Sequence, residues 1–204
     1  MSKGSVFIIS GPSGSGKDAL LSKLFKKCPE IEFSISSVTR GMREGEKEGE
    51  KYNFITREEF ERMIEEDKLL EYNLYVDNYY GTPSEPVERA VNENKDIFIE
   101  VDVNGAESIR KKLPEAISIF VMPPSFEELK RRLSSRGTET EEVINLRMAA
   151  SLGEIKRAAE YDYIVVNDDL STAVDDIISI IKGSKYCLKR QKHIINEVLK
   201  NVKS

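Results

Sequence analysis

A glycine-rich segment near the start of the chain, GPSGSGK from Gly11 to Lys17, limits the possible folds more than any other feature. It has the spacing G-x-x-x-x-G-K, follows the apolar run VFII (6–9) and precedes an amphipathic segment. Between a buried strand and a helix, backbone N–H groups of such a loop curl around a phosphate, and the helix N-terminus adds its dipole. Lys17 can then reach the β- and γ-phosphates, so the segment predicts a nucleotide triphosphate site.

The residue that follows this loop departs from the usual pattern. Position 18 is normally Ser or Thr, whose hydroxyl ligates Mg²⁺, but this chain has Asp18. Its carboxylate could bind Mg²⁺ directly or through water. It could instead place a favourable negative charge at the helix N-terminus, or it could repel the nucleotide. Among these open alternatives, we expect a working site with an altered metal dependence.

Four apolar runs predict the strands of a parallel sheet. They are rich in β-branched or aromatic residues and lack polar alternation, which is typical of strands buried on both faces. The runs are VFII (6–9), IFIEV (97–101), ISIFVM (117–122) and YIVV (163–166). Helical patterns lie between them, and we expect the last of these helices to stop at Gly183. Strands that alternate with helices predict an α/β fold with a parallel sheet flanked by helices.

Two regions interrupt this alternation. Residues 33–80 are too long for a simple connection and predict a functional lobe. Residues 125–158 are rich in arginine and have a helical pattern. Each region also contains the signature of a capping box, in which a hydroxyl and a carboxylate close the start of a helix reciprocally. The two predicted boxes are Thr56 with Glu59 and Ser125 with Glu128.

Composition narrows the function classes. The formal net charge of −5 gives no overall electrostatic case for binding nucleic acid or an anionic membrane. We expect no signal peptide and no membrane span, because a span needs about 20 consecutive apolar residues. Cys28 and Cys187 have no metal or redox spacing, so we expect a reducing, cytoplasmic location.

The region 33–80 holds candidate ligands for a second substrate. Arg40 and Arg43 can grip a phosphate through bidentate hydrogen bonds, and Tyr52 can add a neutral donor. A carboxylate such as Glu71 accepts two hydrogen bonds side by side, which suits the N1–H and N2–H₂ groups of guanine and not the edge of adenine. Taken alone, these residues are more typical of an ordinary polar surface.

Several stretches together resemble the guanylate kinase family, to about residue 183: SGPSGSGK, SISSVTRGMREGE, EGEKYNF, LLEYNLYVDNYYGTP, IEVDVNGA, PPSFEELKRRLSSRGTETEE and VVNDDL. The resemblance implies a P-loop kinase fold. It also implies phosphoryl transfer from ATP to GMP, and to dGMP, in purine nucleotide metabolism, with Mg²⁺ as cofactor. It divides the chain into a kinase-like domain (1–183) and a basic helical tail (184–204). Within the domain it implies a core (1–32, 81–124, 159–183), a GMP-binding lobe (33–80) and a lid (125–158).

The resemblance also implies roles for individual residues. The predicted ATP-binding residues are Gly11, Pro12, Ser13, Gly14, Ser15, Gly16, Lys17 and Asp18, with Asn167 against adenine. The predicted guanine readers are Ser36, Glu71 and Thr82, and the predicted clamps on the GMP phosphate are Arg40, Arg43, Tyr52 and Tyr80. Asp102 is implied beside both guanine and the catalytic centre. The implied catalytic cations are Lys17, Arg132, Arg136 and Arg147. Asp18 is the one candidate metal ligand, directly or through water.

Two rival functions fit parts of the same pattern. A non-catalytic guanylate-kinase-like module that binds peptides usually loses loop residues or the arginines of the GMP site, whereas this chain keeps Lys17, Arg40 and Arg43. A P-loop kinase for another nucleoside monophosphate is the second rival, but Glu71 and Ser36 fit guanine. We therefore expect the small molecules ATP and GMP as partners, and neither nucleic acid nor membrane.

The tail, residues 184–204, has a helical apolar stripe and is basic, with Glu197 as its single acidic residue. We expect a terminal helix that packs on the body of the protein or on a partner subunit. The sequence leaves the choice between a monomer and a homo-oligomer undetermined.

Overall fold

The central element of the fold is a five-stranded parallel sheet with the strand order β2-β7-β1-β8-β9. The structure is a computed structural model that describes residues 4–135 and 140–200, apart from the side chains at positions 189 and 193. The strands are β1 (Val6–Ser10), β2 (Glu32–Phe33), β7 (Ile97–Glu100), β8 (Ile117–Met122) and β9 (Tyr163–Val166). All four predicted apolar runs form strands of this sheet, so the prediction of an α/β fold is confirmed.

Helices cover both faces of the sheet. Neighbouring residues of a strand point to opposite faces, so a strand of apolar residues presents apolar side chains to the helices on each side. Phe7 and Ile9 pack in one cluster with residues of α1 (Lys17–Lys27) and α7 (Leu170–Ser184). Ile8 packs in another cluster with residues of α3 (Ser84–Asn92) and α4 (Val103–Lys112). Residues Phe7 to Ser10 of the central strand β1 are therefore buried, and the loop that follows them lies at the carboxyl edge of the sheet.

The outermost strand, β9, differs from the prediction that all four runs are buried on both faces. Val165 packs into the core against the α7 side, but Ile164 and Val166 point the other way and are 52% and 49% exposed. The prediction is wrong here because β9 ends the sheet and only one of its faces is well covered.

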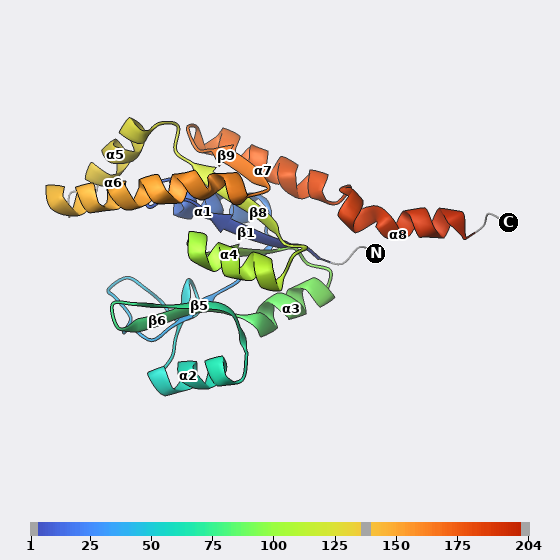
Figure 1. Ribbon diagram of the computed structural model, residues 1–204, viewed down its shortest axis with the longest axis horizontal. Coiled ribbons are helices and arrows are strands. Elements are labelled where there is room, and N and C mark those ends of the chain that lie inside the picture. The colour runs from blue at the N-terminus through green and yellow to red at the C-terminus, as the bar shows by residue number, and fades with distance from the viewer. Residues whose placement is uncertain (1–3, 136–139, 201–204) are drawn as a thin grey trace.

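A second sheet, with the order β4-β3-β6-β5, forms a separate layer together with α2 (Arg57–Glu65). Its strands are β3 (Ser36–Val38), β4 (Tyr52–Phe54), β5 (Leu69–Tyr75) and β6 (Asn78–Pro83). Phe60 of α2 stacks on Tyr79, with ring centroids 5.1 Å apart. The predicted capping box of Thr56 and Glu59 is present at the start of α2. Figure 1 shows this layer on the opposite side of the central sheet from the helices α5 and α6.

The region predicted as a lid contains α5 (Phe126–Ser134), α6 (Glu141–Lys156) and the 3-10 turn η1 (Arg157–Glu160). Leu129 and Leu133 of α5 pack against Ile144 and Met148 of α6. Only half of the predicted capping box at Ser125 forms, because the Ser125 hydroxyl accepts the backbone N–H of Glu128 at 3.0 Å while the Glu128 side chain turns away. Its carboxylate instead accepts charge-assisted bonds from Arg131 and Arg132, which are stronger than a bond to a neutral N–H.

The C-terminal segment forms α8 (Leu188–Leu199) after α7. The expected stop at Gly183 is wrong, since α7 continues to Ser184 and Gly183 does not take the left-handed conformation of a terminating glycine. Figure 1 shows α8 extending away from the body. The apolar side chains of Ile194, Ile195, Val198 and Leu199 are exposed, so the predicted packing of this helix on the body is not found. Packing on a partner subunit stays a prediction, as do the predicted domain boundaries.

Two further expectations concern the whole described chain. Cys28 and Cys187 are both free thiols. Within residues 4–135 and 140–200, no helix has the length and apolar character needed to cross a membrane.

Candidate functional site

The glycine-rich segment forms a tight loop between β1 and α1, as its pattern predicts. Gly14 and Gly16 have φ angles of 88° and 89°, in the left-handed region that favours glycine. Gly16 is also the residue that caps the N-terminus of α1. The Lys17 ammonium donates to the carbonyl oxygens of Gly11 at 2.6 Å and Pro12 at 3.2 Å, so its charge is held over the loop itself. This combination of loop, cation and helix N-terminus can hold a chain of phosphates.

Carboxylates surround the Lys17 ammonium. Burial lowers the pKa of Lys17, and the nearby charges of Glu100, Glu154 and Asp18 oppose that shift. Burial also raises the pKa of Glu100 and of Glu154. The loop therefore lies in a partly desolvated setting where charges interact more strongly than in water, and where an incoming phosphate would meet both signs of charge.

Asp18 pairs with Lys51, a residue that the sequence analysis did not single out. Lys51 immediately precedes β4, and its ammonium donates to Asp18 Oδ1 and lies 3.7 Å from Glu100 Oε2. Asp18 stands in the first turn of α1, where negative charge is favoured. Local spacing contains no signal for this contact, because its partners lie 33 residues apart.

A cleft of about 470 Å³ lies between the second sheet and the carboxyl edge of the central sheet. Most of the residues predicted to bind GMP line it, although they come from separate elements of the chain. They are Ser36, Arg40, Arg43, Tyr52, Glu71, Tyr80 and Asp102, and Arg147 of α6 joins them. The structure thus brings these residues together around one cavity.

One end of this cleft contains two carboxyl groups, those of the largely buried Glu71 and of the exposed Asp102. Glu71 is largely buried, and burial raises its pKa to about 7, with the charge of Asp102 adding to the rise. The hydroxyl of Thr82, itself buried, donates to Glu71 Oε1 at 2.7 Å. Asp102 caps the N-terminus of α4 by accepting the backbone N–H groups of Asn104 at 2.9 Å and Gly105 at 2.8 Å. Glu71 thus offers a fixed carboxyl group with one oxygen already oriented by Thr82.

The other end of the cleft is cationic. The Arg40 guanidinium donates to both oxygens of Glu46, at 2.6 and 2.7 Å, and stacks over the rings of Tyr52 and Phe54. The hydrogen bonds from Arg40 lower the pKa of Glu46 to about 2. The backbone N–H of Arg43 donates to the same carboxylate at 2.8 Å. Glu46, another residue that the sequence analysis missed, therefore occupies the kind of bidentate position on Arg40 that a phosphate could take.

The arginine-rich helices reach the loop from the opposite side. Arg132 of α5 donates to the carbonyl oxygen of Asn167 at 3.0 Å, and Arg147 of α6 contacts the Ser13 hydroxyl at 3.4 Å. The amide of Asn167 donates to the carbonyl oxygen of Ser15 at 2.8 Å, which anchors the loop to the end of β9. Arg136, the third predicted cation of this set, lies outside the described residues.

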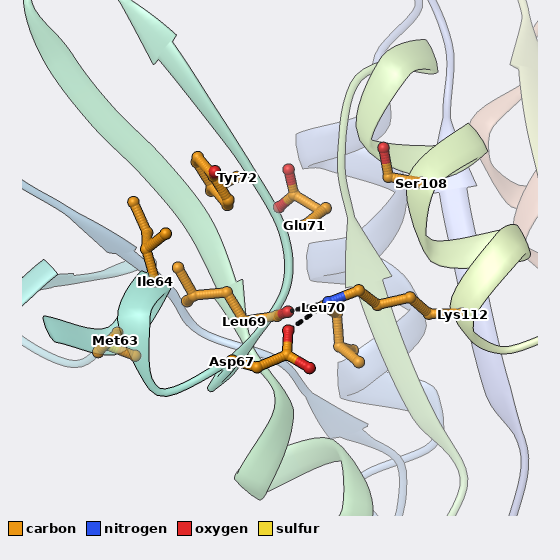
Figure 2. Close-up of a pocket in the computed structure, with 9 residues that line it drawn as sticks. All are labelled: Met63, Ile64, Asp67, Leu69, Leu70, Glu71, Tyr72, Ser108 and Lys112. Atoms are coloured by element: carbon orange, nitrogen blue, oxygen red, sulfur yellow. Dashed lines mark hydrogen bonds and ion pairs between the residues drawn. The ribbon is translucent and has the colours of Figure 1, made fainter. Parts of the chain in front are cut away.

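A smaller cavity, of about 200 Å³, lies behind Glu71 at the junction of the second sheet and α4. Figure 2 shows Lys112 of α4 reaching across this junction. Its ammonium donates to Asp67 Oδ1 at 2.9 Å and to the carbonyl oxygen of Leu69 at 2.8 Å. This contact joins the second sheet to the body at the point where β5 begins.

Comparison with known proteins identifies relatives of the whole chain. Residues 3–184 match the family model described as guanylate kinase. The chain is 42% identical over 195 residues to a guanylate kinase of Desulfitobacterium hafniense, covering 96% of this chain and 98% of that protein. It is 47% identical over 194 residues to a guanylate kinase of Sodalis glossinidius, with 94% of each covered. The crystal structure of guanylate kinase from Anaplasma phagocytophilum superposes with a TM-score of 0.79 at 30% identity, covering 98% of this chain and 96% of that one.

Proposed function

The chain belongs to the guanylate kinase family, and we propose that its cleft and phosphate loop together transfer the γ-phosphoryl group of ATP to GMP, giving ADP and GDP. The observation that carries the proposal is the single cleft beside the phosphate loop, lined by both the buried carboxyl group and the arginines. The two ends of that cleft match the two ends of a purine nucleoside monophosphate that bears guanine.

Guanine is recognised at the buried end. An ionised Glu71 accepts hydrogen bonds from N1–H and N2–H₂ of guanine, which adenine lacks, and the bond from Thr82 keeps the carboxyl group in place. Ser36 supplies a hydroxyl from β3, and Asp102 adds a second carboxylate near the ring. Because none of these contacts involves the 2′-hydroxyl of the sugar, dGMP is accepted as well.

The phosphate of GMP binds at the cationic end. Arg40 and Arg43 supply the charge, and Tyr52 and Tyr80 supply hydroxyl donors. Glu46 holds the Arg40 fork in a bidentate arrangement, so the phosphate has to displace this carboxylate to bind the same guanidinium. Tyr52 follows Lys51, whose ammonium donates to Asp18 beside the loop, and this proximity supports an in-line approach of the GMP phosphate oxygen to the γ-phosphorus.

Transfer of the phosphoryl group requires stabilisation of its negative charge and does not require a protein nucleophile. Lys17 stands over the loop and neutralises charge that develops on the moving group, and Arg132 and Arg147 approach it from the lid. A lid closed over the loop also excludes water, which limits hydrolysis of ATP. Arg136 is proposed as a third lid cation only because of the family resemblance, since it lies outside the described residues.

Magnesium is the proposed cofactor. The carboxylate oxygens of Asp18 and Glu100 are donors that fit a cation arriving with ATP. Both already attract one positive charge, that of Lys51. Within the described residues no group of three or more His, Cys, Asp or Glu side chains could hold a metal ion, so phosphates and water must complete its shell. When bound with ATP, Mg²⁺ neutralises charge on the β- and γ-phosphates.

One acceptor panel tests the proposal. A coupled assay for ADP with ATP, Mg²⁺ and each of GMP, dGMP, AMP, UMP and CMP should show turnover with GMP and dGMP alone. Turnover with AMP or a pyrimidine nucleotide would contradict the assignment of Glu71 as a guanine reader. No turnover with any acceptor would favour a non-catalytic module.

A further inference from the structure

The contact between Asp18 and Lys51 joins two parts of the site that are far apart in sequence. Asp18 directly follows the lysine of the phosphate loop, and Lys51 directly precedes Tyr52, one of the residues that line the GMP cleft. The Lys51 ammonium also lies 3.7 Å from Glu100, at the end of β7. The residue that precedes β4 of the second sheet therefore places its ammonium group at the edge of the phosphate loop.

The charges at this point require such a cation. Asp18 and Glu100 place two carboxylates beside the path of a polyanionic ATP, and both lie close enough to Lys17 to act on its charge. Lys51 adds a second positive charge to that of Lys17 beside these two carboxylates. The Ser or Thr that usually stands at position 18 is neutral, whereas the acidic residue in this chain gives Lys51 a carboxylate to pair with.

The exposure of the Asp18, Lys51 and Glu100 side chains indicates whether their charges affect folding stability or ligand binding. Asp18 is 71% exposed, Lys51 is 47% exposed, and Glu100 is 16% exposed. Ion pairs this exposed contribute little to folding stability. Their electrostatic field still acts on a multiply charged ligand that approaches the loop, where each uncompensated negative charge lowers the local concentration and affinity of an anion.

We propose that Lys51 is a positioning residue for ATP, which neutralises Asp18 and Glu100 and thereby permits an aspartate to stand directly after the phosphate loop. The residue acts through the two carboxylates and needs no contact with the phosphates. The proposal deepens the assignment of the loop as an ATP site and rests on it.

Affinity for ATP in the absence of metal isolates this effect. Isothermal titration calorimetry with ATP and a chelator should show binding weakened about 10-fold in Lys51→Met, as expected for the loss of one positive charge near a polyanion. Lys51→Arg should restore most of the affinity. Lys47→Met is the matched control, because Lys47 lies in the same connection but pairs only locally, with Glu50 at 3.1 Å; its affinity should stay at the wild-type value.

A double-mutant cycle identifies Asp18 as the partner. In the Lys51→Met background, Asp18→Ser should raise the affinity for ATP about 10-fold, whereas in the wild-type background it should change it by about 3-fold or less. Equal factors in the two backgrounds would overturn the proposal. So would a wild-type affinity in Lys51→Met without metal, even if its Mg²⁺ dependence were altered, because the lysine would then act only on the metal.

The same variants separate this proposal from the proposed function. For Lys51→Met, steady-state assays with GMP and Mg²⁺ should show the change in the KM for ATP and leave kcat nearly unchanged, and the denaturation midpoint should stay constant. If the wild-type chain itself transfers no phosphoryl group, the proposed function fails. If the wild type is active and Lys51→Met behaves like Lys47→Met, only the role of Lys51 fails.

Discussion

The phosphate loop and the GMP cleft hold their charged groups by different means. In the loop, Lys17 is fixed by carbonyl oxygens of Gly11 and Pro12, which lie only five or six residues away. In the cleft, Arg40 is fixed by a carboxylate, and Glu71 is oriented by a hydroxyl from another strand. The position of the Lys17 ammonium is thus set by contacts within the loop itself. In the cleft, by contrast, the pair of Arg40 with Glu46 must rearrange and Glu71 must lose its proton when a ligand binds. Four predictions use this difference.

The largest effect is expected at the rigid loop. Lys17→Ala should lower kcat by about 1,000-fold or more, because a preorganised cation on the transferring group is lost and nothing in the loop can replace it. The KM for GMP should change little, since the cleft is built from other elements. Turnover rates and far-UV circular dichroism of the variant provide the measurement and its folding control. A turnover rate equal to that of the wild type would remove the loop from the catalytic machinery.

The second prediction concerns the buried end of the cleft. Glu71→Gln has the same shape, but its amide presents only one acceptor oxygen, so one guanine donor stays unpaired in a buried site. The value of kcat/KM for GMP should fall about 100-fold, while the KM for ATP should remain within about 2-fold of the wild type. Equal losses for both substrates would mean that Glu71 supports the fold of the cleft and does not read the base.

The third prediction concerns the cationic end. Arg40→Ala should raise the KM for GMP about 30-fold with a smaller effect on kcat, because a charge-assisted bidentate contact to phosphate is lost. The matched control is Arg62→Ala, which removes an arginine from α2, a helix that lines no part of this cleft. The comparison of loop and cleft would break down if Arg40→Ala lowered kcat as strongly as Lys17→Ala.

The smallest effect is a pH dependence confined to the cleft. Burial raises the pKa of Glu71 to about 7, and guanine requires the ionised form, so the KM for GMP should rise up to 10-fold per unit as the pH falls below 7. The KM for ATP should not follow this curve, and Glu71→Gln should abolish it. Measuring both KM values between pH 5.5 and pH 8.5, with the ionic strength held constant, tests the difference between the two regions.

The same raised pKa has an opposite consequence for stability. Between about pH 4.5 and pH 7, the unfolded chain has released the Glu71 proton while the folded chain still holds it, so the free energy of unfolding falls as the pH rises through this window. The group therefore stabilises the fold under conditions where it binds GMP poorly. A buried carboxyl group at a ligand site commonly carries such a conflict.

Much of the molecule could be predicted from local spacing. The glycine-rich loop, the four strands and the capping box at Thr56 each depend on residues close together in the chain, so their geometry follows from the backbone alone. The resemblance to known kinases then indicated which distant residues belong together, and the structure does bring seven of the eight predicted GMP ligands to one cleft, with the eighth, Thr82, bonded to Glu71.

Other features were decided only by the tertiary structure. The exposure of β9 depends on its place at the edge of the sheet, and the failure of the second capping box depends on which partner the Glu128 carboxylate finds. The pKa of Glu71 depends on how many atoms surround it, and the pairing of Asp18 with Lys51 depends on how the second sheet sits against the loop. Local spacing specifies backbone geometry, but the strength and partners of charges depend on distance and burial, which exist only once the chain has folded.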